Sequence, residues 1–474
     1  MRSTWFSSKD PVGRRGAVRL NQQAGRGRCG AVPAALGACA LSLGLFGLPG
    51  SAQAAGYANG DQSPAGVALA GAMTARADDA SAIYYNPAGL GFQSGLSVLA
   101  GVTLISPNQS VTDASGATFN TKSQLFVLPT IFAAARVSER VSFGLGAYVR
   151  HATGIDWRNP DNKGVFPGRY KAENVALQSF TFSPTMAIRP ISQLSLAFGL
   201  NIETGSLELE RSLNLGSSDG HIALSGGALN ASATVGALLR LLDGRLNFGL
   251  NYRSASTLRF EKMALGITSP SNVALHLPYT KGETELPTPH TISVGVAGKP
   301  LPWLTVSADY IATLWSSVRE QRITLSSDDN HTQTQIIPRA WSDASSGRLG
   351  LEADLRTFLP KSKLWPKIRV GFGYYQSTVP SSTLEPSAPD ADRILPSVGF
   401  ALGLRGVGSI EASYSAVIFS QRTSENPDLR LTYNGTLHVI SAALNLQLER
   451  VFGTHSAPYS ARLLDRTADL PPSS

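Results

Sequence analysis

The sequence predicts an all-β fold, a transmembrane antiparallel β-barrel of about 14 strands with a small helical N-terminal plug in its lumen. Three observations lead to this prediction: a secretory signal, strand candidates with one apolar and one small or polar face, and strictly alternating short and long connections. The composition agrees, because 16% charged residues is low against about 25% in soluble domains. The 2 Cys exclude a disulfide-built scaffold.

Residues 1–54 have the features of a secretory signal peptide. Seven basic residues and one acidic residue accompany an apolar stretch, 31–48, and the segment ends in Ala52-Gln53-Ala54. We predict cleavage after Ala54; a transmembrane anchor is the alternative, because 31–48 is near the lower length limit for a spanning helix. Cleavage reduces the net charge from +8 to about +2 and removes both cysteines, so the charge gives no argument for nucleic acid.

Alternating residues continue through the rest of the chain and indicate strands. In 245–253, apolar Leu246, Phe248, Leu250 and Tyr252 alternate with Asn, Gly and Arg, and 141–150 and 194–203 repeat this pattern. Such strands fit a soluble sandwich or an outer-membrane barrel with its apolar face toward lipid. The polar faces are rich in Gly, Ser, Asn and Ala rather than Lys and Glu, which favours the barrel.

The connections discriminate between these two folds. Short connections alternate with long polar ones near 107–121, 151–174, 211–227, 265–282, 325–345, 379–391 and 421–436. Bacterial barrels have short periplasmic turns and long external loops, and both chain ends lie in the periplasm. We therefore predict a barrel over 94–452, with a final strand over 438–452, followed by a disordered tail, 453–474.

Residues 55–93 do not alternate and are rich in small side chains. The pattern predicts short helices over 65–77 and 79–85, followed by a turn at Asn86-Pro87. A compact segment before a barrel suggests a plug in the lumen, and the alternative is a flexible periplasmic leader. The apolar residues at helical spacing and the pair Tyr84-Tyr85 favour packing.

The segment from Asp79 through Asn86, Pro87 and Ala88 to Leu90 resembles the plug of the FadL/TodX family of outer-membrane transporters. Further similar motifs follow in the family's order at 248–254, 286–289, 308–310 and 314–316. The resemblance implies a fourteen-stranded barrel with an N-terminal plug. It also implies passive transport of long-chain fatty acids or aromatic hydrocarbons, with lateral exit at a kink in the third strand.

The third predicted strand is 141–150, and its Gly144 and Gly146 either permit a bend or relieve crowding in the lumen. Inward-facing Arg150, Arg253 and Arg369 are candidates for binding a ligand carboxylate; ion pairs with Glu203, Asp309 and Glu411 are the favoured alternative. Tyr148 and Tyr375 either line the substrate path or fill space. The candidate path residues are these: Gly144, Gly146, Tyr148, Arg150, Arg253 and Tyr375.

The mature chain contains no nucleotide-binding or hydrolase motif, and its scattered histidines form no short metal-ligand spacing. We expect no enzyme activity, no catalytic residue, no cofactor, no metal and no nucleic acid. The expected partners are a hydrophobic small molecule, outer-membrane lipid and lipopolysaccharide, and the barrel-assembly machinery, with the protein a monomer. The alternatives are a porin for hydrophilic solutes, a surface adhesin and a lipid-processing enzyme.

Overall fold

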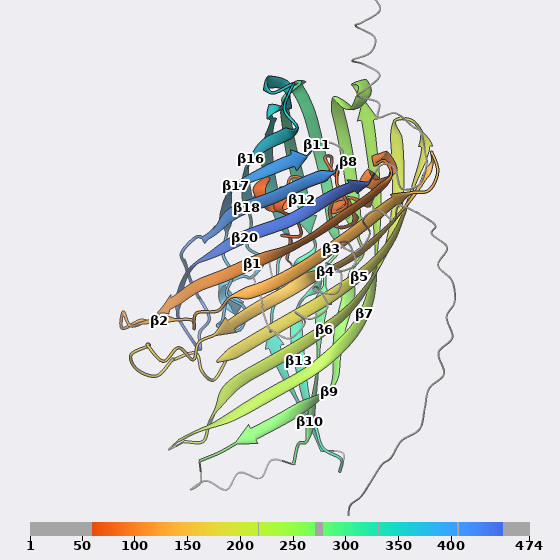
Figure 1. The fold of residues 1–474 in the computed structure, drawn as a ribbon. Helices are drawn as coiled ribbons and strands as arrows, with labels where there is room; N and C mark the ends of the chain where they lie inside the picture. The colour runs from red at the N-terminus through yellow and green to blue at the C-terminus, as the bar shows by residue number, and fades with distance from the viewer. Residues whose placement is uncertain (1–58, 217, 271–277, 330, 405–406, 449–474) are drawn as a thin grey trace, which may run out of the picture. The chain divides into compact units, whose positions relative to one another are not determined.

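The computed structural model describes residues 59–448 apart from 217, 271–277, 330 and 405–406. It is a single antiparallel sheet of 20 strands, with a few short helices inside (Figure 1). The strands of the first half are β1 (Leu96–Thr112), β2 (Thr118–Asn120), β3 (Phe126–Arg136), β4 (Val141–Asp156), β5 (Asn174–Ile191), β6 (Leu194–Asn214), β7 (Asp219–Leu241), β8 (Leu246–Arg253), β9 (Ser256–Thr268) and β10 (Lys281–Thr288). The second half contains β11 (Thr291–Leu301), β12 (Leu304–Thr313), β13 (Glu320–Ser326), β14 (Thr332–Pro338), β15 (Ala344–Asp354), β16 (Leu364–Tyr375), β17 (Arg393–Leu404), β18 (Gly408–Phe419), β19 (Arg422–Thr423) and β20 (Thr432–Leu448).

The sheet closes because β1 pairs with β20 along its whole length, from Leu96↔Leu448 to Thr112↔Thr432. Four wall strands are interrupted and consist of two segments each: β8 with β9, β10 with β11, β12 with β13, and β14 with β15. The short β2 and β19 extend hairpins at the rim. The wall is therefore a closed 14-strand barrel, which confirms the predicted fold class.

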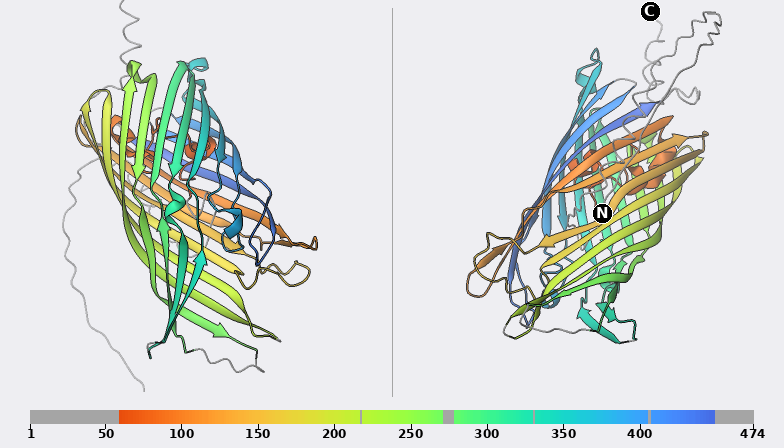
Figure 2. Two further views of the ribbon diagram at one scale, coloured as in Figure 1. Left: turned by 180° about the vertical axis from the view of Figure 1, so that it is seen from behind. Right: turned by 60° about the horizontal axis from the view of Figure 1, so that its bottom comes forward.

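Short turns and long connections gather at opposite ends of the barrel (Figures 1 and 2). Two predicted loops are wrong, however. Within 211–227, β6 continues to Asn214 and β7 begins at Asp219, so most of this range is strand. Within 325–345, β13 and β14 pair with each other. Polar residues on both faces produced the loop prediction. These residues lie at the long-connection end of the wall, where both faces of a strand can meet water and polar residues are tolerated.

Side chains alternate across the wall as predicted. On β6, Leu196, Phe198, Leu200 and Ile202 point outward and are 38–52% exposed, whereas Ser195 and its inward neighbours are buried. An outward tyrosine follows the last large apolar residue of this belt on three strands: Tyr252, Tyr310 and Tyr374. An apolar belt edged by aromatic residues is what a lipid-facing barrel wall requires.

The N-terminal segment lies inside the barrel and forms α2 (Pro64–Ala68), α3 (Ala82–Tyr85) and the 3₁₀ helix η1 (Pro87–Phe92). The predicted helix over 65–77 is too long, because Ala70 and Gly71 have φ of 50° and 82° and end it after one turn. Further 3₁₀ turns are η2 (Leu242–Gly244), η3 (Trp315–Ser317), η4 (Leu355–Phe358) and η5 (Ser381–Thr383). Among the described residues, no helix has the length and apolarity to cross a bilayer. The predicted signal peptide 1–54, the tail 453–474 and the end of the last strand lie outside the described residues.

Candidate functional site: the lumen and its plug

Asn86 fastens the plug to the barrel wall. Its Nδ2 donates to the carbonyl of Thr74 in the plug at 2.7 Å and to the carbonyl of Ala237 on β7 at 3.1 Å. Its Oδ1 accepts from the N–H of Ala88 at 3.2 Å and caps η1, in which Pro87 is the first residue. The Asn-Pro-Ala segment therefore satisfies the start of one helix and joins plug to wall with the same side chain.

Glycines on the wall strands allow the backbone of the plug to approach the wall closely. A Cβ at Gly249 on β8 would lie 2.1 Å from the carbonyl oxygen of Thr74, and one at Gly371 on β16 would lie 2.5 Å from the N–H nitrogen of Ala70. The neighbouring wall residue Asp309 accepts the N–H of Thr74 at 2.7 Å. The backbone of the plug thus packs directly on the wall, which any larger side chain at these glycines would prevent.

A buried ionic network joins the plug to the wall strands β15, β16 and β18. Arg76 of the plug contacts Glu352 on β15 (Nη2–Oε2, 2.5 Å), and Arg369 on β16 contacts the same oxygen from Nε at 2.7 Å. Arg369 also pairs with Glu411 (Nη1–Oε2, 2.5 Å). Nearby, Asp79 accepts from the N–H and hydroxyl of Ser81. Burial raises the pKa of the Asp79 carboxyl to about 6, with Asp78 and Glu411 adding to the rise.

A cavity of about 130 Å³ lies between the plug and the wall and brings together three of the predicted path residues: Arg150, Arg253 and Tyr375. Arg253 lies over the ring of Tyr84, with its guanidinium carbon 4.6 Å from the ring centre, and donates to the Tyr84 carbonyl at 2.8 Å. Arg150 donates to Ser232 at 2.7 Å and lies 3.7 Å from a Glu203 oxygen. Tyr148 lies outside the cavity lining and hydrogen-bonds Ser183 and Asn201.

The cavity also contains cations that the sequence analysis did not single out. Arg348 and Arg393 lie over the ring of Tyr375, with guanidinium carbons 4.7 Å and 5.4 Å from its centre. Arg393 Nη2 is buried and has no acceptor among the residues that the structure describes. Arg348 and Arg393 occupy inward positions of β15 and β17, so strand alternation is the signal that could have identified them.

The third wall strand, β4, separates from β3 part-way along. The β3–β4 ladder runs from Arg136↔Ser142 to Ile131↔Ala147 and stops, although β3 continues to Phe126 and β4 to Asp156. Pairing of β4 with β5 shifts register between Val149 and Ala152. The irregularity is therefore in the strand predicted to contain it, but beyond the glycines proposed to cause it.

Gly144 and Gly146 stay in register with both neighbouring strands. A Cβ at Gly144 would lie 2.6 Å from Leu90 and one at Gly146 would lie 3.0 Å from Ile83, and both of these side chains belong to the plug. Close approach of the plug, rather than a bend, is what these two positions provide in the structure.

The start of the plug occupies the inner side of this break. The Arg150 carbonyl accepts from the N–H of Asn59 at 2.8 Å, and the Val149 carbonyl accepts from Asn59 Nδ2 at 3.1 Å and Gln62 Nε2 at 2.8 Å. Thr103 on β1 donates to the Asp61 carbonyl at 3.2 Å. Carbonyls that lack a β3 partner are thus satisfied by residues 59–62.

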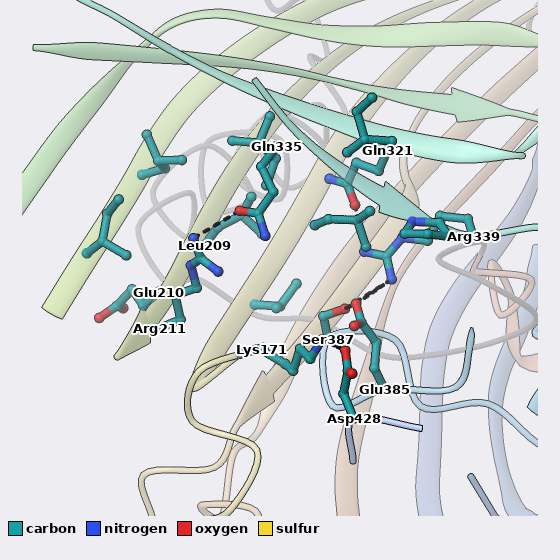
Figure 3. A pocket seen from close by; sticks show the side chains of 18 of the residues that line it. Lys171, Leu209, Glu210, Arg211, Gln321, Gln335, Arg339, Glu385, Ser387 and Asp428 are labelled. Atoms are coloured by element: carbon teal, nitrogen blue, oxygen red, sulfur yellow. Dashed lines mark hydrogen bonds and ion pairs between the residues drawn. The ribbon is translucent and has the colours of Figure 1, made fainter. Parts of the chain in front are cut away.

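The lumen toward the long loops is apolar. Its largest cluster contains Trp157, Phe260, Trp315 and Trp341, all of them buried. Beyond it, a larger cavity of about 770 Å³ opens among the long connections, lined by both apolar and charged side chains (Figure 3). No group of three metal-ligating side chains occurs within the described part of the chain.

Comparison with known proteins agrees with this geometry. A family model described as outer membrane protein transport protein (OMPP1/FadL/TodX) matches residues 47–452. The chain belongs to this family. It is a member of an outer-membrane transport family, and its location is the outer membrane.

Individual relatives of this FadL/TodX chain are distant. A Pseudomonas aeruginosa FadL homologue has a TM-score of 0.71 at 18% identity and covers 83% of this chain and 100% of its own. The Pseudomonas putida toluene transporter TodX has a TM-score of 0.67 at 16% identity, and the match covers 82% of this chain and 99% of TodX. An outer membrane protein of Neisseria meningitidis is 36% identical over 135 residues, 26% of this chain and 29% of that relative. The two structures share the fold, and the family members compared are transporters rather than enzymes.

Proposed function

We propose that this chain carries hydrophobic molecules passively across the outer membrane, from the long-loop end into the lumen and out sideways through the break between β3 and β4. The proposal brings to this chain what the names of its structural relatives state for them, a FadL homologue and toluene transporters. The apolar cluster around Trp315 and Trp341 supports it, because such a lining solvates apolar ligands in a way that a water-filled pore does not.

The break in β4 carries the proposal. A straight path to the short-turn end is obstructed by the plug, which is bound to the wall through Asn86, Arg76 and the Asp309–Thr74 contact. At the break, β3 has no ladder pairing with β4 residues 148–156, although β5 still pairs with most of them. Residues 59–62 and the N–H of Lys122 contact the β4 carbonyls there. A ligand that leaves there would enter the bilayer directly and avoid the aqueous periplasm.

The same proposal covers the parts of the chain that precede and follow the barrel. Residues 1–54 would be removed on export, 55–93 would form the plug, 94–452 the barrel, and 453–474 a disordered tail. The partners would be a hydrophobic ligand, the lipids and lipopolysaccharide of the outer membrane, and the barrel-assembly machinery, with the barrel acting as a monomer.

Cross-linking the break tests the exit route. Cysteines replacing Pro129 and Val149 continue the register of Ile131↔Ala147 across the break, and a cleavable bismaleimide would join them. We expect cross-linking to block uptake of oleate or toluene and reductive cleavage of the linker to restore it. The matched control replaces Ala133 and Leu145, a pair within the intact ladder. Full uptake by protein shown to be cross-linked at 129 and 149 would contradict lateral exit.

The porin alternative is tested with the same protein in planar bilayers. Steady ion conductance by the wild type would favour a diffusion pore for hydrophilic solutes, whereas a plugged barrel should conduct little. A barrel that takes up none of the apolar probes would contradict the transport proposal itself.

A further inference from the structure

A buried ion pair lies at the boundary between the outer cavity and the apolar pocket next to it. The outer cavity of about 770 Å³ and an inner pocket of about 70 Å³ share lining from Val175, Leu209, Gln321, Arg339 and Ser387. At this boundary Arg339 Nη1 donates to Glu385 Oε1 at 2.8 Å (Figure 3). Both side chains are less than a tenth exposed.

The two partners come from different parts of the chain. Arg339 directly follows β14, and Glu385 belongs to the connection between β16 and β17. Arg339 makes two further hydrogen bonds: Gln321 Oε1 accepts from its Nη2 at 2.6 Å, and Ser387 Oγ accepts from its Nη1 at 3.1 Å. Thr383 also donates to the Arg339 carbonyl at 2.7 Å, so the connection is fastened at this residue.

The inner pocket, at about 70 Å³, has roughly a tenth of the volume of the outer cavity of about 770 Å³. Its walls include Leu177, Leu207, Val318 and Trp341. A ligand that moves inward from the outer cavity must therefore displace side chains at the boundary. An apolar molecule that parts Arg339 from Glu385 leaves each buried charge with neutral hydrogen-bond partners only, Gln321 and Ser387, which is unfavourable.

A ligand carboxylate changes this balance. It can accept the two parallel hydrogen bonds that a guanidinium offers, so it can replace Glu385 on Arg339 without leaving the cation unpaired. Ser387 Oγ already lies 2.5 Å from Glu385 Oε1 and can continue to donate to it. Of the charged pairs in the outer cavity, Lys171–Asp428 is by contrast exposed and accessible to water.

We propose that a ligand carboxylate replaces Glu385 as the ionic partner of Arg339. This replacement makes Arg339 the residue that determines specificity for anionic amphiphiles. The proposal rests on the proposed transport function and adds the chemical class of its ligand. The tail of such a molecule would follow the apolar walls inward. Arg393 lines the cavity between the plug and the wall, and its buried Nη2 has no acceptor among the described residues. After Arg339, this cation would bind the ligand headgroup closer to the plug.

The test compares uptake of oleate with uptake of oleyl alcohol, which has the same carbon chain and a neutral headgroup. The cells used have no other outer-membrane route for either probe. For Arg339→Gln we expect oleate uptake to fall roughly tenfold, because a hydrogen bond to a charged group is lost, with oleyl alcohol changed less than about twofold. For Glu385→Gln, which removes the competing carboxylate, we expect half-saturation at a severalfold lower oleate concentration.

Asp328→Asn is the matched control, because it breaks an exposed pair with Lys281 outside both cavities and should leave both probes unchanged. Heat-modifiable electrophoretic mobility verifies that each variant is a folded barrel. Equal losses of acid and alcohol in Arg339→Gln, or weaker oleate capture in Glu385→Gln, would overturn the inference. A wild type that takes up neither probe would instead overturn the proposed transport function.

Discussion

Asn86 and Gly236 share one small space between plug and wall. A Cβ at position 236 on β7 would lie 2.3 Å from the Asn86 Oδ1 atom, closer than any real contact allows. The same oxygen caps η1 through the N–H of Ala88. The absence of a side chain on β7 is therefore a condition for the hydrogen bonds that hold the plug in place.

Replacement of Gly236 with Val should displace the plug while leaving the barrel in the membrane, because the strand still pairs with β6 and β8. We expect a rise in single-channel conductance in planar bilayers. Gly347→Val is the control, since a Cβ at Gly347 has no described atom within 4 Å. Equal conductance of the two variants would show that the plug does not depend on this contact.

Replacing Asn86 and Pro87 together with alanine removes three hydrogen bonds and the fixed first residue of η1. Each bond contributes about 1 kcal/mol, so we expect normal insertion with a loosened plug and altered uptake. Asn86→Asp is a useful comparison, because it keeps the acceptor for the Ala88 N–H and loses both donated bonds. Hydrogen exchange in 82–92 measures the loosening, and unchanged exchange and uptake would remove this turn from the mechanism.

The sequence predicted the wall well because alternation is a direct consequence of lipid on one side and a filled lumen on the other. Leu196 and Phe198 point outward for that reason. The sequence prediction failed at 211–227, where β6 and β7 still pair although most residues are small or polar. It did not locate the shift at Val149 either, because the carbonyl partner that stabilises the break, Asn59, lies 90 residues away in the chain. A hydrogen bond between residues so far apart in the chain cannot be predicted from their spacing or from their residue types.

Glu352→Gln tests the ionic network. The change leaves Arg76 without its buried partner and takes one of two carboxylates from Arg369. Loss of one member of a buried pair costs about 3 kcal/mol, which we expect as a lower free energy of unfolding in urea. Glu285→Gln breaks the exposed pair with Arg259 and should cost at most about 1 kcal/mol. Similar losses for both variants would mean that the network does not stabilise the plug.

Asp79 makes the stability of the plug dependent on pH. Its pKa is raised to about 6 in the folded chain, against 3.8 for the ordinary carboxyl, so the folded state binds the additional proton between these values. The free energy of unfolding should therefore fall as pH rises from about 4 through 6, by no more than about 3 kcal/mol. Asp79→Asn keeps an acceptor for Ser81 and should remove the part of this dependence that comes from Asp79. Burial likewise raises the pKa of Asp61 to about 6, and that part is unchanged in the variant. Parallel pH profiles of the two proteins would contradict the assignment to Asp79.

Asn59 and Gln62 should control how readily the break in β4 opens. Both side-chain amides donate to the carbonyl of Val149, and Gln62 Nε2 also donates to the carbonyl of Asn59. The main-chain N–H of Asn59 donates to the next β4 carbonyl, that of Arg150. Replacing both with alanine leaves the Val149 carbonyl without these donors at a point where β3 offers none. We expect faster hydrogen exchange of amides 149–152 and, if opening limits exit, severalfold faster uptake of apolar probes.

The isosteric pair Asn59→Asp with Gln62→Glu separates loss of hydrogen bonding from loss of volume. Neither carboxylate can donate to the Val149 carbonyl, so this variant should open as readily as the alanine variant although it fills the same space. Gln447→Ala, at an exposed position on β20, is the control and should change neither measurement. Faster exchange without faster uptake would place the rate-limiting step elsewhere, such as at the Arg339–Glu385 boundary. Unchanged exchange would show that residues 59–62 cover the break without holding it closed.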